Sequence, residues 1–358
     1  MNVAECMGMG MRVLTEAGVE NARADVEWLI ASCLETRRMQ SYLNLNRDLD
    51  EMQQRHFESS LRRRAAREPL QHILGTAEFF GRSFEVNRFV LIPRPETELL
   101  ADLGVRHLRQ QPEPSQRPVG EVRHSGSPLL ALDFGTGSGC LAVTLALEIG
   151  GREHVHTADE IRGREPPMWE GRCGLTEPPK PTSSRSPDCW VPTPSSASRF
   201  TERREVEITA IDISLDAIEV ARRNARRHGC EGAVRFFQGD GFAALRSVVP
   251  SAMERFDLIL TNPPYIPWGE ILGLQPEVRD YDPVLALDGG EDGLDFYRRL
   301  AVEASVWMRE TGVLMAEFGD GQFEKIAGLF RDAGWVVEEP IRDDSGRLRI
   351  LIARPAAS

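Results

Sequence analysis

The chain has 358 residues, of which 41% are hydrophobic and 27% are charged, and its net charge at pH 7 is -12. This balance is typical of a soluble globular protein with room for two domains, and the acidity argues against broad binding to nucleic-acid phosphates. The sequence contains no run of about 18 apolar residues, so no transmembrane helix is predicted. The six cysteines are scattered and form no C-x-x-C pair. We therefore expect a cytoplasmic monomer with reduced thiols that contacts neither membrane nor nucleic acid.

Residues 1–70 are predicted to form a small helical domain. In "NARADVEWLIASCLE", Asn21 is a candidate N-cap, and apolar residues recur at spacings of three and four from Val26 to Cys33. The polar stretch "DEMQQRHFESSLRRRAARE" predicts another helix, with Pro69 just beyond it. The pattern leaves two roles open for this domain: a stabilising appendage, or a surface that recognises a partner.

Residues 71–100 are predicted to form a linker. Apolar and polar residues alternate around two glycines in "QHILGTAEFFGRSFEVNRFVLIPRPETELL", which favours a short hairpin between two domains. The "IPRPETE" element then leads into a helix, with Thr97 or Glu98 in its first turn.

Residues 101–358 alternate strands and helices, which predicts a mostly parallel sheet covered on both faces. The expected strands lie in "LLALDFG", "VEITAID", "AVRFFQGD", "RFDLILTN" and "GVLMAEFG". One expected helix runs from Ser214 as N-cap to Gly229 as its stop, and another lies around 293–309. The end of the chain, "GWVVEEPIRDDSGRLRILIARP", predicts an antiparallel edge hairpin that turns at Asp344–Ser345–Gly346.

One segment interrupts this alternation. Residues 150–204 hold eight of the 23 prolines and show no sustained apolar periodicity, so we interpret them as a disordered surface insertion. The segment contains His154, His156, Cys173 and Cys189. Their spacings match no common zinc pattern, and we predict no metal site.

A glycine-rich loop, "DFGTGSG", follows the first of these strands. Gly135, Gly137 and Gly139, with Thr136 and Ser138 between them, allow a tight turn and a close approach by a ligand. The helix that follows directs its N-terminal amides at the same place, which favours an anion. The motif is also found in purely structural turns, so it needs further support.

Two acidic residues at the ends of the next strands provide that support. A nucleoside-binding fold places a ribose-binding acid about 20 residues after the loop. Asp212 lies 73 residues after Gly139, and the insertion accounts for the excess. Asp240 ends the third strand, where it is either an acceptor for an adenine amino group, with Phe242 beside the ring, or an ordinary turn residue.

The fourth strand ends in "NPPY", at the same edge of the sheet. Pro263 and Pro264 fix φ and remove two backbone donors, Asn262 adds a side-chain acceptor, and Tyr265 offers a flat face. Two acceptors, from Asn262 and the Pro263 carbonyl, suit a planar –NH₂ group. They orient an amide nitrogen and stabilise the positive charge that develops on it during attack. The alternative is an ordinary turn after a buried strand.

Several motifs in the chain resemble those of the release factor glutamine methyltransferases, the PrmC/HemK family of S-adenosylmethionine-dependent enzymes. The resemblance covers about 300 residues and excludes the insertion. It includes "ENARADVEWLIA", the linker with "IPRPETE", and then "DFGTGSG", "AIDIS", "NPPYIP", "DPVLALDGGEDGLDFY" and "EFGDGQ" in the family's order. NPPY alone is moderately specific, and NPPY together with "IPRPETE" is highly specific.

The resemblance implies a seven-stranded Rossmann-like methyltransferase domain after a helical domain that recognises the substrate protein. The implied reaction is S-adenosylmethionine-dependent methylation of the side-chain amide nitrogen of the Gly-Gly-Gln glutamine in class I peptide chain release factors. By position, Gly135 to Gly139 bind the cofactor's methionine part, Asp212 binds the ribose, and Asp240–Gly241 lie at the adenine. Asn262 is a further implied cofactor-binding residue. Asn262, Pro263, Pro264 and Tyr265 hold the glutamine.

Three positions depart from the family pattern. Phe134 stands where Leu is usual, Phe318 where Ile is usual, and Gly241 where the family often has a Trp beside the adenine. Phe242 is the candidate replacement for that aromatic contact.

Three other functions remain open. One is a glutamine methyltransferase acting on a ribosomal protein, whose family usually lacks "PRPETE". Another is an adenine-N6 or guanine-N2 nucleic-acid methyltransferase, against which the acidic charge counts. The third is a non-catalytic module that binds release factors or ribosomes, against which the intact glycine loop, Asp212 and NPPY argue.

Overall fold

The computed structural model describes residues 1–111, 128–150, 205–248 and 255–356. Of the insertion predicted at 150–204, residues 151–204 lie outside the described residues, and so do the four His and Cys residues considered as zinc ligands. Within the described parts, no helix is both long and apolar enough to cross a membrane.

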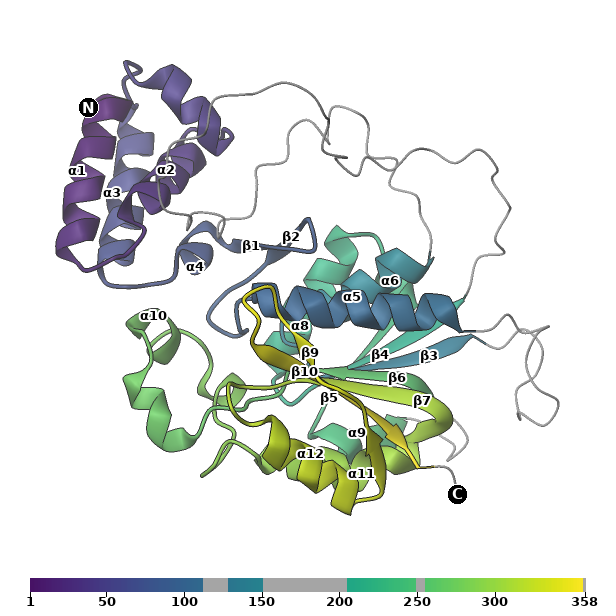
Figure 1. The fold of residues 1–358 in the computed structure, drawn as a ribbon. Helices are drawn as coiled ribbons and strands as arrows, with labels where there is room; N and C mark the ends of the chain where they lie inside the picture. The colour runs from purple at the N-terminus through teal and green to yellow at the C-terminus, as the bar shows by residue number, and fades with distance from the viewer. Residues whose placement is uncertain (112–127, 151–204, 249–254, 357–358) are drawn as a thin grey trace, which may run out of the picture.

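The N-terminal region is a helical bundle that stands apart from the sheet (Figure 1). Its members are α1 (Val3–Glu16), α2 (Ala22–Cys33), η1 (Arg38–Asn44), α3 (Glu51–Ala65) and α4 (Leu70–Leu74). Capping boxes begin α1 and α3, where Asn2 and Asp50 accept the backbone N–H three residues on. Asn21 occupies the predicted N-cap position of α2, but its side chain makes no capping bond.

A hairpin, β1 (Thr76–Phe79) and β2 (Arg82–Glu85), follows the bundle. Its two loop residues, Phe80 and Gly81, both have positive φ, as the tight turns between twisted strands require. Asn224 fastens the hairpin to the next domain, since its side-chain amide bonds both the N–H and the carbonyl of Glu85.

The second domain is built on one mixed sheet. Five parallel strands lie in the order β5 (Val234–Gln238), β4 (Val206–Asp212), β3 (Leu129–Phe134), β6 (Phe256–Thr261) and β7 (Met308–Glu317). Antiparallel β10 (Leu348–Pro355) follows β7, and β8 (Trp335–Val337) and β9 (Ile341–Arg342) both pair with β10. The α/β class and the mostly parallel sheet agree with the prediction.

The strand count needs correction. The sheet has eight strands where seven were predicted, because the first arm of the hairpin is divided into β8 and β9. Pro340 lies between the two pieces and has no N–H to donate to a ladder. The antiparallel hairpin itself lies at the edge of the sheet, as predicted, with its second arm, β10, between β7 and β8.

Helices cover both faces of the sheet (Figure 1). On one face lie α5 (Pro95–Gln110), α6 (Cys140–Gly150) and α8 (Leu215–Arg227), and on the other α9 (Gly241–Val248), α11 (Asp295–Glu303) and α12 (Phe323–Asp332). Each layer has its own apolar core against the sheet. Gly104 lets α5 approach β6, since a Cβ there would meet Leu260 at 2.8 Å. The short elements are η3 (Glu231–Ala233), η4 (Trp268–Gly273), α10 (Pro276–Arg279), η5 (Val284–Ala286) and η6 (Ala304–Trp307).

An ion-pair cluster joins the helical bundle to the segment that follows NPPY. Glu277 on α10 accepts from Arg67 Nε at 2.6 Å and from Arg64 Nη2 at 3.0 Å. The Arg64 Nε donates to Asp25 Oδ2 at 2.6 Å, and its side chain is only 8% exposed. The Tyr281 hydroxyl adds a bond to the Ala66 carbonyl. The bundle is thereby held beside the carboxyl edge of the sheet.

Replacing Glu277 with alanine is expected to weaken the contact between the helical bundle and the sheet domain. Removing one partner of a buried ion pair costs about 3–5 kcal/mol, and the lower end applies because the Glu277 side chain keeps 16% of its exposure. Thermal unfolding and the rate of proteolysis between the bundle and the sheet would measure the effect. Glu270→Ala, on the exposed face of η4, is the matched control. An unchanged melting temperature and cleavage rate in Glu277→Ala would contradict the assignment.

Candidate active site

A cavity of about 250 Å³ lies at the carboxyl ends of the parallel strands. The strand order reverses between β3 and β6, because β4 and β5 continue to one side of β3 and β7 to the other. Open α/β sheets bind ligands at such a switch point. The loops that follow β3, β4, β5 and β6 all contribute to the lining, and so does the segment before α5.

The glycine loop forms one wall of this cavity. Gly135 and Gly137 have φ of 79° and 53°, and a Cβ on either would meet nothing within 4 Å, so both backbones face open space. Thr136 and Ser138 also line the cavity. Gly139 does not: it has φ of 80°, and a Cβ there would come within 3.0 Å of the Ala221 Cβ on α8. Gly139 therefore allows close packing of the loop against α8 and is not part of the cavity wall.

Asp133, which the sequence analysis did not single out, supports the loop from beneath. Its Oδ2 accepts from the Thr136 hydroxyl at 2.6 Å and from the Ala142 N–H at 3.1 Å. The residue is completely buried, and this burial raises the pKa of Asp133 to about 7. Its place in the motif "DFGTGSG", directly before the turn, was the signal that could have identified it.

Asp212 lies at the end of β4 and lines the cavity. Its two oxygens accept backbone N–H groups, Oδ2 from Gly137 and Oδ1 from Ser214, each at 2.9 Å. Burial raises the pKa of this carboxyl above its usual value, against the lowering effect of those N–H groups. The carboxylate is therefore held in place, and each oxygen keeps a lone pair for a further donor.

Asp240 and Gly241 line the cavity, but Phe242 does not. The Asp240 carboxylate forms an ion pair with Arg299 on α11. The Phe242 ring is fully buried in the core, with ring centroids 4.7 Å from Phe134 and 6.4 Å from Trp307. The proposed aromatic contact from Phe242 is therefore wrong, because α9 begins at Gly241 and its next residue points into the sheet layer.

Phe89, Phe134 and Phe296 supply the aromatic surface of the cavity instead. The ring centroids of Phe134 and Phe296 lie 5.7 Å apart in an edge-to-face arrangement. A Cβ on Gly241 would come within 2.6 Å of the tip of the Phe134 ring. The two departures from the family pattern are thus coupled, since the larger side chain at 134 occupies the space beside the small residue at 241.

This coupling predicts the stability of a double variant. Gly241→Ala is expected to lower the melting temperature by about 2–8 °C, because a side chain at φ of 54° costs about 1–2 kcal/mol and the added Cβ crowds Phe134. Adding Phe134→Leu should make the double variant less destabilised than the sum of the single variants. Gly232→Ala, where a Cβ meets nothing, is the control. Strict additivity would show that the two positions do not interact.

The NPPY loop forms the opposite wall. Asn262, Pro263 and Pro264 line the cavity, whereas Tyr265 does not and its ring packs against the core. The Tyr265 carbonyl accepts from Gln322 Nε2 at 2.8 Å. A Cβ on Gly289, in the "LDGGEDG" stretch, would approach the Pro264 carbonyl at 2.9 Å. The "LDGGEDG" and "EFGDGQ" motifs therefore support the loop from behind.

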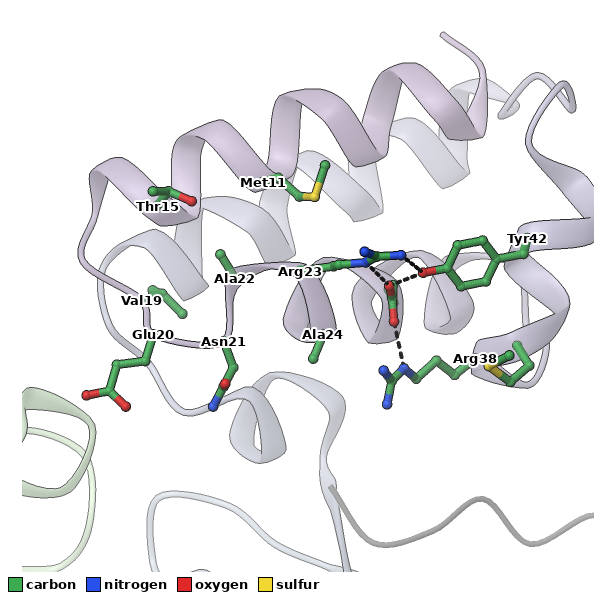
Figure 2. A pocket seen from close by; sticks show the side chains of 12 residues that line it. Met11, Thr15, Val19, Glu20, Asn21, Ala22, Arg23, Ala24, Arg38 and Tyr42 are labelled. Carbon is green, nitrogen blue, oxygen red and sulfur yellow. Dashed lines mark hydrogen bonds and ion pairs between the residues drawn. The ribbon is translucent and has the colours of Figure 1, made fainter. Parts of the chain in front are cut away.

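A larger hollow, of about 760 Å³, lies on the helical bundle and away from this edge. Figure 2 shows Arg23, Arg38 and Tyr42 converging on one carboxylate, which belongs to the buried Glu27. Burial opposes ionisation of Glu27, but its three hydrogen-bonded neighbours leave its pKa below the usual value. The Glu27 carboxylate thus finds its hydrogen-bond donors in neighbouring residues of the bundle. Among the described residues, no group of three or more His, Cys, Asp or Glu side chains could hold a metal ion.

Comparison with known proteins identifies the family. Residues 6–75 match the family described as "PrmC N-terminal domain", and residues 196–319 match "Methyltransferase domain". The release factor glutamine methyltransferase of Geobacter sulfurreducens is 34% identical over 341 residues, which cover 95% of this chain and 92% of that protein. That of Cereibacter sphaeroides is 32% identical over 358 residues and covers all of both chains.

Among solved structures, a methyltransferase from Pyrococcus furiosus superimposes with a TM-score of 0.42 at 16% identity, over 78% of this chain and 91% of that one. The assignment rests on the sequence relatives, whose similarity extends through both the helical bundle and the sheet domain. The chain belongs to the family of release factor glutamine methyltransferases.

Proposed function

We propose that this protein methylates the side-chain amide nitrogen of the glutamine in the Gly-Gly-Gln motif of class I peptide chain release factors. The observation that carries the proposal is the position of the NPPY loop. Its Asn262 shares one cavity with the glycine loop and Asp212, at the switch point of the sheet. The names of the relatives support the release factor as the substrate protein.

The residues around the cavity fit S-adenosylmethionine. The open backbone at Gly135 and Gly137 leaves room for the amino-acid part, and the Asp212 carboxylate can accept from a ribose diol. Phe134 and Phe296 offer apolar faces for an adenine. When bound, this cofactor supplies the electrophilic methyl group.

The protein's contribution to the chemistry is to orient the glutamine amide. Its nitrogen is a weak nucleophile because the lone pair is delocalised into the carbonyl. The Asn262 oxygen and the Pro263 carbonyl would each accept one N–H, which holds the nitrogen in place and stabilises the positive charge that develops there. Pro263 is buried, and both prolines line the cavity beside these acceptors.

The helical bundle is the proposed recognition surface for the release factor. It matches the family's N-terminal domain. The ion pairs of Glu277 with Arg64 and Arg67 hold it beside the segment that follows NPPY. A bound protein could therefore contact the bundle while its glutamine reaches the cavity. The net charge of -12 disfavours a nucleic-acid substrate, and we propose that the protein acts as a cytoplasmic monomer.

The proposal is tested by transfer of label from S-adenosylmethionine to a purified release factor. Transfer should occur to the natural factor and should disappear when its Gly-Gly-Gln glutamine is replaced by alanine. A ribosomal-protein fraction and a nucleic-acid substrate serve as the comparison. Label that persists on the release factor with the replaced glutamine, or that goes only to one of the other substrates, would contradict the proposal.

A further inference from the structure

Three side chains from separate elements form a hydrogen-bonded row behind the NPPY loop. Asn262 Nδ2 donates to Thr97 Oγ1 at 3.0 Å, and Thr97 Oγ1 donates to Glu317 Oε2 at 2.7 Å. Asn262 follows β6, Thr97 lies in the first turn of α5, and Glu317 ends β7. Thr97 is 3% exposed and Glu317 2% exposed, so water hardly competes for these bonds.

The donors in this row all point one way, toward Glu317, and the ionised state of Glu317 determines that direction. An ionised carboxylate can only accept hydrogen bonds, so the single hydroxyl proton of Thr97 must point to Glu317. The Thr97 oxygen is then an acceptor on its other side and takes an N–H from Asn262. Because the two polar ends of an amide are opposite each other, the Asn262 oxygen is directed away from Thr97. Asn262 and Thr97 both line the cavity, so an oxygen turned away from Thr97 is available to a group bound there.

We propose that Thr97 and Glu317 are positioning residues that hold the Asn262 amide with its oxygen toward the cavity, as an acceptor for the substrate amide. This inference rests on the proposed function. Without the row, the amide could rotate by half a turn and present two N–H donors to a group that is itself an N–H donor. Neither Thr97 nor Glu317 needs to touch the glutamine.

Several charged and titratable groups lie around Glu317. Burial raises the pKa of Glu317 to about 7, the Thr97 hydroxyl lowers it, Glu96 raises it, and Arg349 and Arg94 lower it. The Tyr297 hydroxyl donates to the backbone carbonyl of Glu317 at 2.6 Å. The partly buried Tyr265, whose own pKa is raised by desolvation and by Glu317, is a further neighbour. A protonated Glu317 can donate to Thr97 and reverse the row, so the ionised form is the one that works.

Replacing Thr97 separates positioning from packing. Thr97→Val keeps the shape but has no hydroxyl, and it is expected to lower kcat on the release factor by about 10- to 100-fold, as for a misplaced catalytic group. The dissociation constant for S-adenosylmethionine should change less than about twofold. Thr97→Ser, which keeps the hydroxyl, should recover most of the activity. Full kcat in the valine variant, or equal losses in both variants, would overturn the proposal.

The pH profile gives a second measurement that packing alone would not change. The kcat should rise with pH through about 7, as Glu317 ionises, and then level off. Asp133 also has a pKa of about 7, so the natural protein alone does not separate the two acids. Glu317→Gln should remove the rise that Glu317 causes, and an unchanged profile in that variant would contradict the assignment.

The two hypotheses fail in different ways. If the natural protein transfers no label to the glutamine, the proposed function fails. If it does transfer label but Thr97→Val and Glu317→Gln behave like it, only the positioning role fails. If Thr97→Val does not fold, the serine variant and the pH profile of Glu317→Gln decide the question through the same measurements.

Discussion

Asn262→Ala is expected to lower kcat on the release factor by about 10²- to 10³-fold, the range for removing one preorganised electrostatic contact to a developing charge. The substitution removes the side-chain acceptor at the cavity and leaves the Thr97–Glu317 bond in place. Steady-state kinetics with purified release factor would measure the loss. Calorimetric titration would measure cofactor affinity, which should stay within about twofold.

Two comparisons sharpen this experiment. Asn262→Asp keeps an acceptor oxygen but cannot donate to Thr97, and it places a second carboxylate on the row that ends at Glu317. It should therefore also be slow, despite its similar shape. If Asn262→Ala weakened cofactor binding as much as it lowered turnover, the main role of Asn262 would be in holding the cofactor, contrary to our assignment.

Asp212→Ala is expected to weaken S-adenosylmethionine binding by about 10- to 100-fold, since hydrogen bonds to a charged group contribute about 1.5–3 kcal/mol. The carboxylate accepts the Gly137 and Ser214 N–H groups, so its loss also releases the glycine loop. The effect should appear in the dissociation constant, and much of the turnover should return at saturating cofactor.

The matched control for this change is Asp216→Ala, four residues further on at the exposed start of α8. It removes the same charge from the same region without touching the cavity, so cofactor affinity should stay constant. A thermal melt of each variant separates lost binding from lost folding. Equal affinities in Asp212→Ala and the natural protein would rule out the proposed contact with the ribose.

Local patterns were sufficient to predict most elements of the sheet domain. Apolar runs that end in glycines or acids gave the five parallel strands, because a strand covered on both faces must be apolar throughout its length. The glycine loop, Asp212 and the NPPY loop could be placed together for the same reason, since the carboxyl ends of parallel strands meet at one edge.

The errors arose where one residue of register decides the outcome. Phe242 and Gly241 are neighbours in the chain, yet only Gly241 reaches the cavity, because the start of α9 determines which way each points. Gly139 belongs to the glycine motif but packs against α8. The sequence offered no prediction of the order of β10 and β8 in the sheet, since no local pattern determines which neighbour a strand pairs with.

The sequence by itself determined the family, the α/β class and the chemistry of the cavity edge, because these depend on residue types at short spacings along the chain. Only the tertiary structure decided which side chains hydrogen-bond to Asn262 at that edge. Thr97 lies in "IPRPETE" and Glu317 begins "EFGDGQ", 220 positions apart, and neither motif by itself indicates that the two side chains meet. They meet because α5 packs on the strands whose ends carry Asn262 and Glu317, and burial there favours hydrogen bonds between the hydroxyl, the carboxylate and the amide.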